Sequence, residues 1–195
     1  MKIGFVSKFP PERDGGAIYA HYLCENLPCE VVRIGDLGSE ADYRLNLRSF
    51  WLKEKLAEIV EKEKLDLLHV QYVLDGRYFG KYNLKLGLVR ATRQKIPVVV
   101  TFTEVHSECK GLREKVICWL QKQLANRSAA SIAHTPLQAQ VMKHYKIPSY
   151  HIHMGLVLRK MRPKRDKQIL FLGMLGAGKG VEYLIRAMAL LPEYK

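Results

Sequence analysis

Short apolar runs alternate with helical patterns along this chain, and no other feature restricts its fold as strongly. Seven runs of five to seven residues have the length and composition of buried strands. They cover residues 2–7, 30–35, 65–71, 97–103, 131–135, 151–155 and 168–173. Patterns with helical spacing lie between most of them, at residues 16–27, 50–64, 85–95, 112–127 and 137–146. This alternation predicts parallel strands joined by helical crossovers.

The apolar residues also indicate which surfaces are covered. Val98, Val99 and Val100 follow one another without polar alternation, as in a strand that is covered on both faces. In the helix expected at 50–64, one stripe is apolar and charged residues lie opposite it. This stripe consists of Phe50, Trp51, Leu52, Leu56, Ile59 and Val60. We therefore predict an α/β fold, a doubly wound, Rossmann-like parallel sheet of about six or seven strands with helices on both faces.

Positive charge is concentrated in one part of the chain. The net charge is +13, and residues 110–167 contain 13 Lys and Arg against two Asp and Glu. Such a block attracts phosphates, nucleotides, an anionic membrane surface or nucleic acid. Few aromatic residues are interleaved with it, so nucleic acid is disfavoured as a partner.

Hydropathy and cysteine usage bear on the compartment. Of the 195 residues 48% are hydrophobic, yet no apolar run approaches the roughly 20 residues that span a bilayer. The first residues also lack the pattern of a signal peptide. The four cysteines, Cys24, Cys29, Cys109 and Cys118, do not have the spacing of a disulfide framework. We expect free thiols and a cytoplasmic location.

In a doubly wound sheet, ligands bind beyond the carboxyl ends of the strands. The first loop of this kind, residues 7–23, leads through a Pro pair to Gly15 and Gly16, where a helix is expected to begin. Two glycines allow the backbone to approach a ligand, and the N–H groups of a helix start favour an anion. The spacing is not that of a dinucleotide fingerprint. A plain strand-to-helix turn is the alternative interpretation.

Further polar side chains are expected near the carboxyl ends of two neighbouring strands. They are His69, Thr101, Thr103, Glu104 and His106. For His69, a structural role as hydrogen-bonded scaffold and a functional role are equally open.

Two more histidines, His151 and His153, would share one face of a strand, as a pair of metal ligands does. No third ligand lies within sequence reach, so we expect no metal.

A second glycine-rich loop, from Gly173 to Gly180, lies between an apolar run and a helical pattern. A triphosphate-binding loop needs Ser or Thr directly after its lysine, but Gly180 follows Lys179. The loop of adenylate kinases needs a hydroxyl one residue later, where this chain has Val181. Only 16 residues follow Lys179, too few for the remaining elements of a kinase. A phosphate-loop kinase or NTPase is therefore the weaker alternative.

Six segments, in order, resemble the family 4 glycosyltransferases, which have the two-domain GT-B fold. Residues 1–27 are similar to their first strand, Pro-containing loop and Gly-Gly helix start. "LDLLHVQY" (65–72) resembles their Asp-x-x-His-x strand, and "IPVVVTFTE" (96–104) their strand ending in Thr-x-His-Asp. "ASIAHTPLQAQVM" (130–142) and "IHMGLVL" (152–158) resemble the segment before the linker and the Pro-His-Gly-Val turn. Residues 169–192 resemble the first strand and helix of the second domain.

The resemblance implies the transfer of a hexose, with retention of configuration, from a nucleotide-diphosphate sugar to a saccharide or lipid-linked acceptor. It implies no metal and no other cofactor. Residues 1–158 would form the acceptor-side domain, 159–167 a basic linker and 168–195 the start of the nucleotide-sugar-binding domain. The residues expected around the diphosphate are Gly15, Gly16, Gly173, Lys179 and Gly180. The candidates for catalysis are His69, Thr103 and His106.

The chain also departs from the family pattern. Thr103 stands where the family strand ends in histidine, which puts a histidine role there in doubt, and Met154 replaces the histidine of the turn. The family's Glu-x7-Glu segment, which contacts the donor sugar, is missing. We therefore expect an incomplete N-terminal portion that is inactive alone. Peripheral contact with an anionic membrane would bring it to a lipid-linked acceptor. A non-catalytic basic module bound to membrane or nucleic acid is a further alternative.

Overall fold

A computed structural model describes residues 1–73, 85–106, 110–144, 146–155, 169–173, 175 and 179–194. Contacts divide the chain into two compact units, Met1–Val157 and Leu158–Lys195. Within the described residues, no helix combines the length and the apolar composition needed to cross a bilayer.

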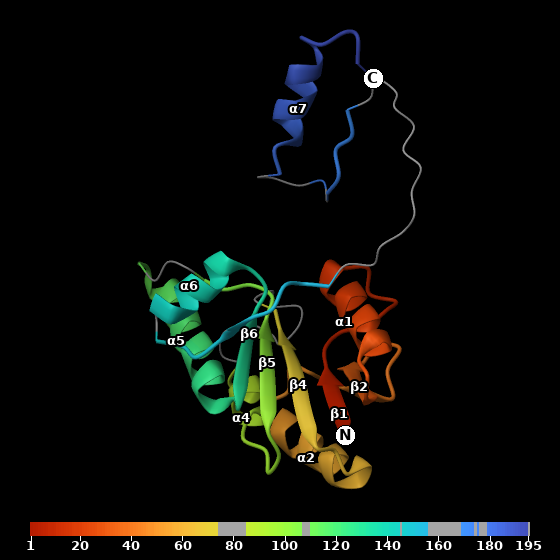
Figure 1. The fold of residues 1–195 in the computed structure, drawn as a ribbon, viewed down its shortest axis with the longest axis vertical. Coiled ribbons are helices and arrows are strands. Elements are labelled where there is room, and N and C mark those ends of the chain that lie inside the picture. The colour runs from red at the N-terminus through yellow and green to blue at the C-terminus, as the bar shows by residue number, and fades with distance from the viewer. Residues whose placement is uncertain are drawn as a thin grey trace. The chain divides into compact units, whose positions relative to one another are not determined.

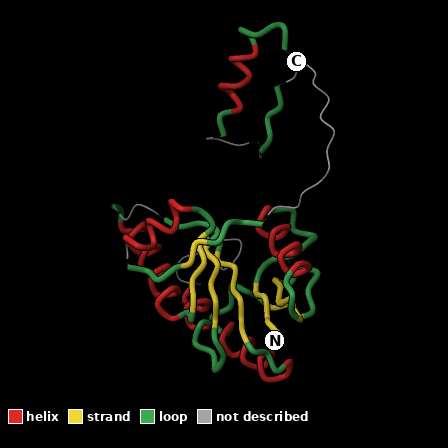
Figure 2. The backbone as a smooth tube through the Cα atoms, viewed as in Figure 1, coloured by secondary structure: helices red, strands yellow, loops and turns green. Residues whose placement is uncertain are grey.

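The first unit is built on one sheet of seven strands, all of them parallel (Figures 1 and 2). The strands are β1 (Lys2–Val6), β2 (Glu30–Asp36), β3 (Tyr43–Leu45), β4 (Leu67–Tyr72), β5 (Val98–Phe102), β6 (Ala130–Ala133) and β7 (Tyr150–His151). Their order across the sheet is β3-β2-β1-β4-β5-β6-β7. The chain first runs outward from β1 to β3 and then returns to the other side of β1 with β4. This confirms the predicted doubly wound sheet and places its switch point between β1 and β4.

Helices cover both faces of the sheet, as predicted. Helix α1 (Gly15–Asn26) packs on one face, while α2 (Leu52–Glu63), α4 (Lys85–Ala91) and α5 (Leu112–Arg127) follow one another on the other (Figure 1). Successive side chains of a strand point to opposite faces. Phe5 accordingly joins a small cluster with Phe9 and the α1 residues Ala20 and Cys24, while Val6 joins the main core. Helix α6 (Pro136–His144) follows β6.

The main core lies between the sheet and the layer of α2, α4 and α5. Its strand residues include Val70, Tyr72, Val100 and Phe102, and each helix contributes at least one fully buried leucine. Examples are Leu56, Leu88 and Leu120. Full burial of one such side chain stabilises a fold by about 1.5–3 kcal/mol. The apolar runs that predict the strands therefore also supply the core.

Several elements differ from the sequence prediction. The short edge strand β3 was not predicted, β7 contains only His151 of the residues expected at 151–155, and α4 ends at Ala91 instead of residue 95. In α2, Leu52, Leu56, Ile59 and Val60 are buried as predicted, whereas Phe50 and Trp51 precede the helix and are largely exposed. Their rings instead lie beside the guanidinium of Arg90, at 4.1 and 5.5 Å from the ring centres.

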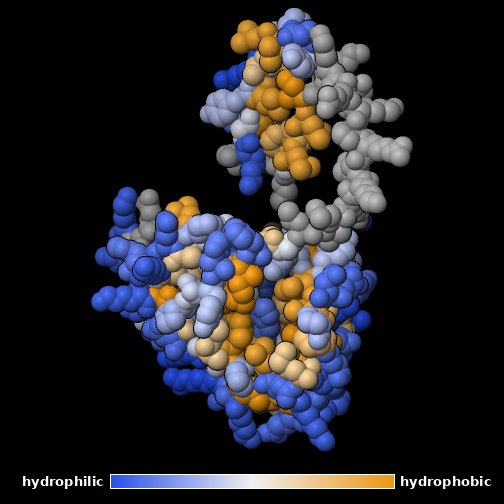
Figure 3. Space-filling model, in the orientation of Figure 1, coloured by the Kyte–Doolittle hydropathy of each residue, from blue (hydrophilic) through white to orange (hydrophobic). Residues whose placement is uncertain are grey.

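The second unit contains one helix, α7 (Val181–Met188). The strand predicted at 168–173 is wrong for its described part, because residues 169–173 are not in a strand. A strand forms only where a neighbouring strand completes its hydrogen bonds, and none of the described residues of this unit provides one. Leu170, Leu172 and Leu175 are consequently more than three-quarters exposed. Hydrophobic side chains are prominent on this unit in Figure 3.

The cysteines do not all follow the prediction of free thiols. Cys24 and Cys29 are free, and burial raises the pKa of the Cys24 thiol to about 12, so this thiol stays protonated. Cys118 in α5, by contrast, is disulfide-bonded. The prediction is therefore wrong for Cys118, because two cysteines that the fold brings together can pair whatever their sequence spacing. Cys109 lies outside the described residues.

Candidate functional site at the carboxyl edge of the sheet

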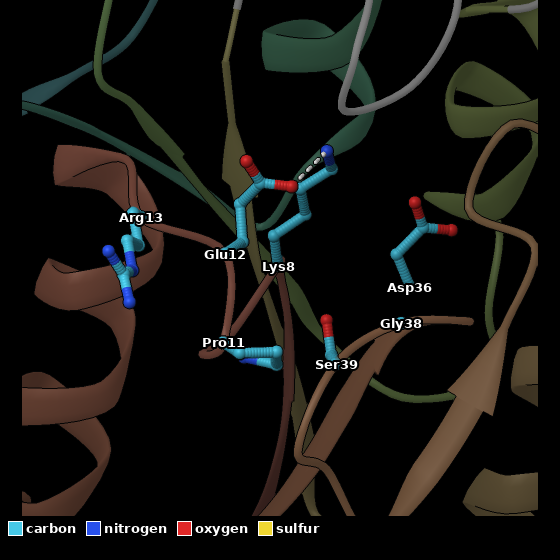
Figure 4. A pocket seen from close by; sticks show the side chains of 7 residues that line it. All are labelled: Lys8, Pro11, Glu12, Arg13, Asp36, Gly38 and Ser39. Carbon is cyan, nitrogen blue, oxygen red and sulfur yellow. Dashed lines mark hydrogen bonds and ion pairs between the residues drawn. The ribbon is translucent and has the colours of Figure 1, made fainter.

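A pocket of about 290 Å³ lies beyond the carboxyl ends of β1 and β2. It is lined by Lys8, Pro11, Glu12, Arg13, Asp36, Gly38 and Ser39 (Figure 4). Asp36 is the last residue of β2, and the others belong to the loops that follow the two strands, which a parallel sheet brings to the same edge. Ligand sites usually measure some 300–1,000 Å³. This pocket therefore has room for one small ring and not for a whole nucleotide sugar.

Hydrogen bonds between the two loops hold the pocket together. The amide of Phe9 donates to Ser39 Oγ at 3.1 Å, and the amide of Glu40 donates to the Pro10 carbonyl at 2.7 Å. Phe9 is fully buried and anchors the loop after β1 in the cluster beneath α1. The pocket walls thus come from a loop that is fixed at several points.

The charges in the pocket are mixed. Lys8 is only 6% exposed, and its Nζ lies 3.3 Å from Glu12 Oε2. The Asp36 carboxylate stands on the other side of Lys8, whereas the Arg13 side chain points away from it (Figure 4). Asp36 Oδ2 also lies 3.3 Å from Nη2 of Arg48. An ammonium flanked by two carboxylates suits a ligand with several hydroxyl groups, because hydroxyls can both donate and accept hydrogen bonds.

Helix α1 begins at Gly15, as its sequence predicts. Asp14 is the residue that caps it, and its carboxylate accepts a hydrogen bond from the Ala17 amide at 2.8 Å. The helical hydrogen bonds start with Ile18 N–H donating to the Asp14 carbonyl, so the amides of Gly15 and Gly16 lie outside that ladder. A helix start attracts anions, but the negative charge of Asp14 offsets part of this attraction.

Gln71 ties the start of α1 to the sheet. Its side chain is fully buried; Oε1 accepts from Ser7 Oγ at 2.8 Å, and Nε2 donates to the Gly16 carbonyl at 3.3 Å. The residue that follows β1, strand β4 and helix α1 therefore meet at one amide group. These bonds hold the Gly15–Gly16 turn at the carboxyl ends of β1 and β4, the switch point of the sheet.

His69 lies in the middle of β4, further from the edge than its sequence position suggests. Its ring packs on Phe5 with 4.7 Å between ring centres, and Nε2 lies 2.6 Å from Thr101 Oγ1. Burial, with a smaller contribution from the nearby His134, lowers the pKa of His69 to about 4. The imidazole is therefore neutral near pH 7, and it can take part in hydrogen bonds there but cannot act as a cation.

Thr103 and His106 follow β5 and take separate roles. Thr103 Oγ1 donates to the Tyr72 carbonyl at 2.9 Å, which closes the end of the β4–β5 ladder. His106 is held against α5, where its amide donates to Gln121 Oε1 at 2.9 Å. Among the described residues, no hydrogen bond joins His69, Thr103 and His106 to one another. The three predicted catalytic candidates do not form a hydrogen-bonded group.

His134, which directly follows β6, was not singled out from the sequence. It is 5% exposed, its Nδ1 lies 2.9 Å from the Ile152 carbonyl, and its ring stands edge-on to Tyr19 of α1. No described residue makes a hydrogen bond to its Nε2. Gln138 donates to the Thr103 carbonyl and accepts from the His134 amide, so the two strand ends are linked. The sequence carries no signal for this placement, because it depends on strand register: Phe102 pairs with Ala133, which sets His134 beside Thr103.

Lys179 and Gly180 of the second unit directly precede α7. Gly180 caps this helix with φ of 75°, a left-handed conformation that favours glycine, and its carbonyl accepts from the amides of Tyr183 and Leu184. Lys179 precedes it and is exposed, and Gly173 is exposed as well. Residues 174 and 176–178 lie outside the described residues.

The structure also bears on metal binding. The rings of His151 and His153 lie 4.4 Å apart, centre to centre. Across the parts of the chain that the structure describes, no group of three His, Cys, Asp or Glu is placed to hold a metal ion.

The all-parallel, doubly wound sheet and the loops at its carboxyl edge define a Rossmann-like domain, consistent with the GT-B class. The model of the family "Glycosyltransferase Family 4" matches residues 12–156, which is well over half of the chain. The chain therefore belongs to glycosyltransferase family 4. Curated protein sequences give no match.

Proposed function

We propose that this protein takes part in the transfer of a hexose from a nucleotide-diphosphate sugar to an acceptor hydroxyl, with retention of anomeric configuration. In this reaction, the bond between the anomeric carbon and the diphosphate oxygen breaks, and the acceptor oxygen takes its place. The acceptor proton leaves with the diphosphate. The family match supports glycosyl transfer in general, and the finer steps are our proposal.

The pocket of Lys8, Glu12 and Asp36 carries the proposal, and we assign it to a sugar ring of the acceptor. Its size fits one ring, and its two carboxylates would accept hydrogen bonds from ring hydroxyls, while the buried ammonium would donate. A free phosphate would instead meet both carboxylates and be repelled. A saccharide acceptor, either free or linked to a lipid, therefore suits the pocket better than an anion.

Each unit contains candidates for binding the donor diphosphate. In the first unit these are the amides of Gly15 and Gly16, and in the second unit Lys179 with Gly173 and Gly180. Backbone amides at a helix start and a lysine ammonium both stabilise the charge that develops on a departing diphosphate. Residues 168–195 would then belong to the nucleotide-sugar-binding domain, after the basic linker 159–167. Thr103 and His106 remain candidates for catalysis, and so does His69, through a hydrogen bond from its neutral imidazole.

Two parts of the proposal concern its surroundings. A cytoplasmic location stays a prediction, and its support from free thiols now rests on Cys24 and Cys29. No metal and no cofactor are invoked for the transfer.

Saturation-transfer NMR tests the acceptor pocket with a panel of monosaccharides. We expect signals for at least one hexose or hexose-like ring, lost in Asp36→Asn and in Glu12→Gln. The matched control is Glu58→Gln, which removes a carboxylate from the exposed surface of α2. Binding that survives both pocket substitutions would refute the assignment.

Calorimetry with UDP-sugars, GDP-sugars and ATP separates the two enzyme classes. Tight, Mg²⁺-dependent binding of ATP in preference to the nucleotide sugars would favour a phosphate-loop NTPase and contradict the proposed transfer.

A further inference from the structure

Helix α5 has two apolar faces, and the first unit covers only one of them. Ile117, Leu120 and Leu124 are buried in the protein. On another side of the helix, Leu112, Val116 and Trp119 are 82%, 37% and 50% exposed. At 100° per residue, these three positions lie within roughly 60° of one another. They form one continuous strip, called here the α5 stripe.

Cationic side chains border the α5 stripe. By the same helical geometry, Lys115 and Lys122 lie along one side of it and Arg113 lies toward the other. Lys110 precedes the helix. The one acid of the helix, Glu114, folds back over the Gly111 backbone at the helix start. Its charge there stabilises the helix start, where anions are favoured, and it does not lie within the stripe.

The surrounding sequence adds to this charge. Between residues 110 and 155, seven Lys and Arg stand against Glu114 as the single acid. The edge of the first unit that carries α5 and α6 is densely hydrophilic in Figure 3. An exposed Leu, Val and Trp therefore stand within a strongly basic surface.

We propose that the α5 stripe inserts into the headgroup region of an anionic lipid bilayer. A helix that lies in a membrane interface has this composition: an apolar strip with Trp, bordered by Lys and Arg. Tryptophan favours the level of the headgroups, and the cations gain from the negative surface potential. The proposal does not depend on glycosyl transfer, although it would bring the protein to a lipid-linked acceptor.

Other polyanions suit this surface less well. Nucleic acid would use the lysines but gains nothing from an exposed leucine and valine, and a single tryptophan is no stacking platform. An acidic protein would need an apolar groove that is complementary to the stripe, and the stripe is only two helical turns long. A bilayer satisfies both the apolar strip and its cationic border at once.

Tryptophan fluorescence gives a direct test, because Trp51 and Trp119 are the only two tryptophans of the chain. The variant Trp51→Phe reports on Trp119 alone. The variant Trp119→Phe reports on Trp51, which is 62% exposed and lies at the start of α2, outside the α5 stripe. Both variants are titrated with vesicles of phosphatidylcholine alone and with vesicles containing phosphatidylglycerol. We expect a blue shift and quenching by brominated lipid for Trp119 only, and only with the anionic vesicles.

Sedimentation with the same vesicles measures the affinity. We expect Trp119→Ala to weaken binding about tenfold, and each of Lys115→Gln and Lys122→Gln to weaken it about fivefold. Lys55→Gln on α2 is the matched control and should leave binding unchanged. An unshifted Trp119, equal binding to neutral vesicles, or binding of nucleic acid or an acidic polypeptide in place of anionic vesicles would each overturn the proposal.

Discussion

The buried amide of Gln71 offers the sharpest test of how the start of α1 is held. Gln71→Met keeps the length and shape of the side chain but removes both hydrogen bonds, to Ser7 Oγ and to the Gly16 carbonyl. Each bond contributes about 0.5–1.5 kcal/mol, and a buried partner that is left unsatisfied adds a further cost. Because Gln71 has no exposed surface, water cannot replace it. We expect the free energy of unfolding to fall by about 2–3 kcal/mol.

Urea unfolding followed by tryptophan fluorescence measures this loss for the first unit alone, since both tryptophans lie in it. Gln94→Met is the matched control. Gln94 also donates twice, to the carbonyls of Lys53 and Ala91 at 3.1 Å, but it is only half-buried. In Gln94→Met, water can hydrogen-bond to the two carbonyls that lose their donor, so we expect the free energy of unfolding to fall by less than about 1 kcal/mol.

A double-mutant cycle isolates the pair. Ser7→Ala alone should cost about 1 kcal/mol. The double variant Ser7→Ala, Gln71→Met should lose less than the sum of the two single losses, by about 1 kcal/mol, because their shared hydrogen bond is removed only once. Additive losses, or a Gln71→Met loss no greater than that of Gln94→Met, would refute the reasoning.

Three further predictions follow from single positions. The folded pKa of His69 is about 4, below its usual 6.5. Between these values the unfolded chain binds more protons than the folded one, so the free energy of unfolding decreases as the pH is lowered. His69 should make the protein about 2 kcal/mol less stable at pH 5 than at pH 7. Urea titrations of His69→Gln should show that much less pH dependence, and an unchanged dependence would contradict the assignment. Gly87→Ala would make Cβ clash with the Ser49 carbonyl oxygen and should lower the free energy of unfolding by about 2 kcal/mol or more. Gly15→Ala, with open space around it, should change this free energy by under about 0.5 kcal/mol; similar melting points for the two variants would count against this close contact. Lys179→Ala should weaken calorimetric binding of a nucleoside diphosphate roughly tenfold through loss of a charge-assisted contact, while Arg186→Ala on α7 should not, and equal effects would argue against a specific role for Lys179.

The sequence alone determined the class of fold, because the signals for it are local. Val98–Val100 show a strand that is covered on both faces, and the spacing of Leu52, Leu56, Ile59 and Val60 shows a helix with one buried side. Such patterns arise within one element and need no partner to be read. Even so, β3 escaped detection, because three residues at a sheet edge are too few to establish a period.

The site was decided by the tertiary structure, because its residues meet only through the register of the sheet. Lys8 and Asp36 lie 28 positions apart and share a pocket only because β1 and β2 run parallel and end together. His134 stands beside Thr103 through the pairing of β5 with β6. His69, by contrast, lies in mid-strand and not at the edge where the sequence predicted it, and burial keeps its imidazole neutral there. Helical spacing alone could not tell which apolar side of α5 is covered, since burial depends on which groups the rest of the chain places against it.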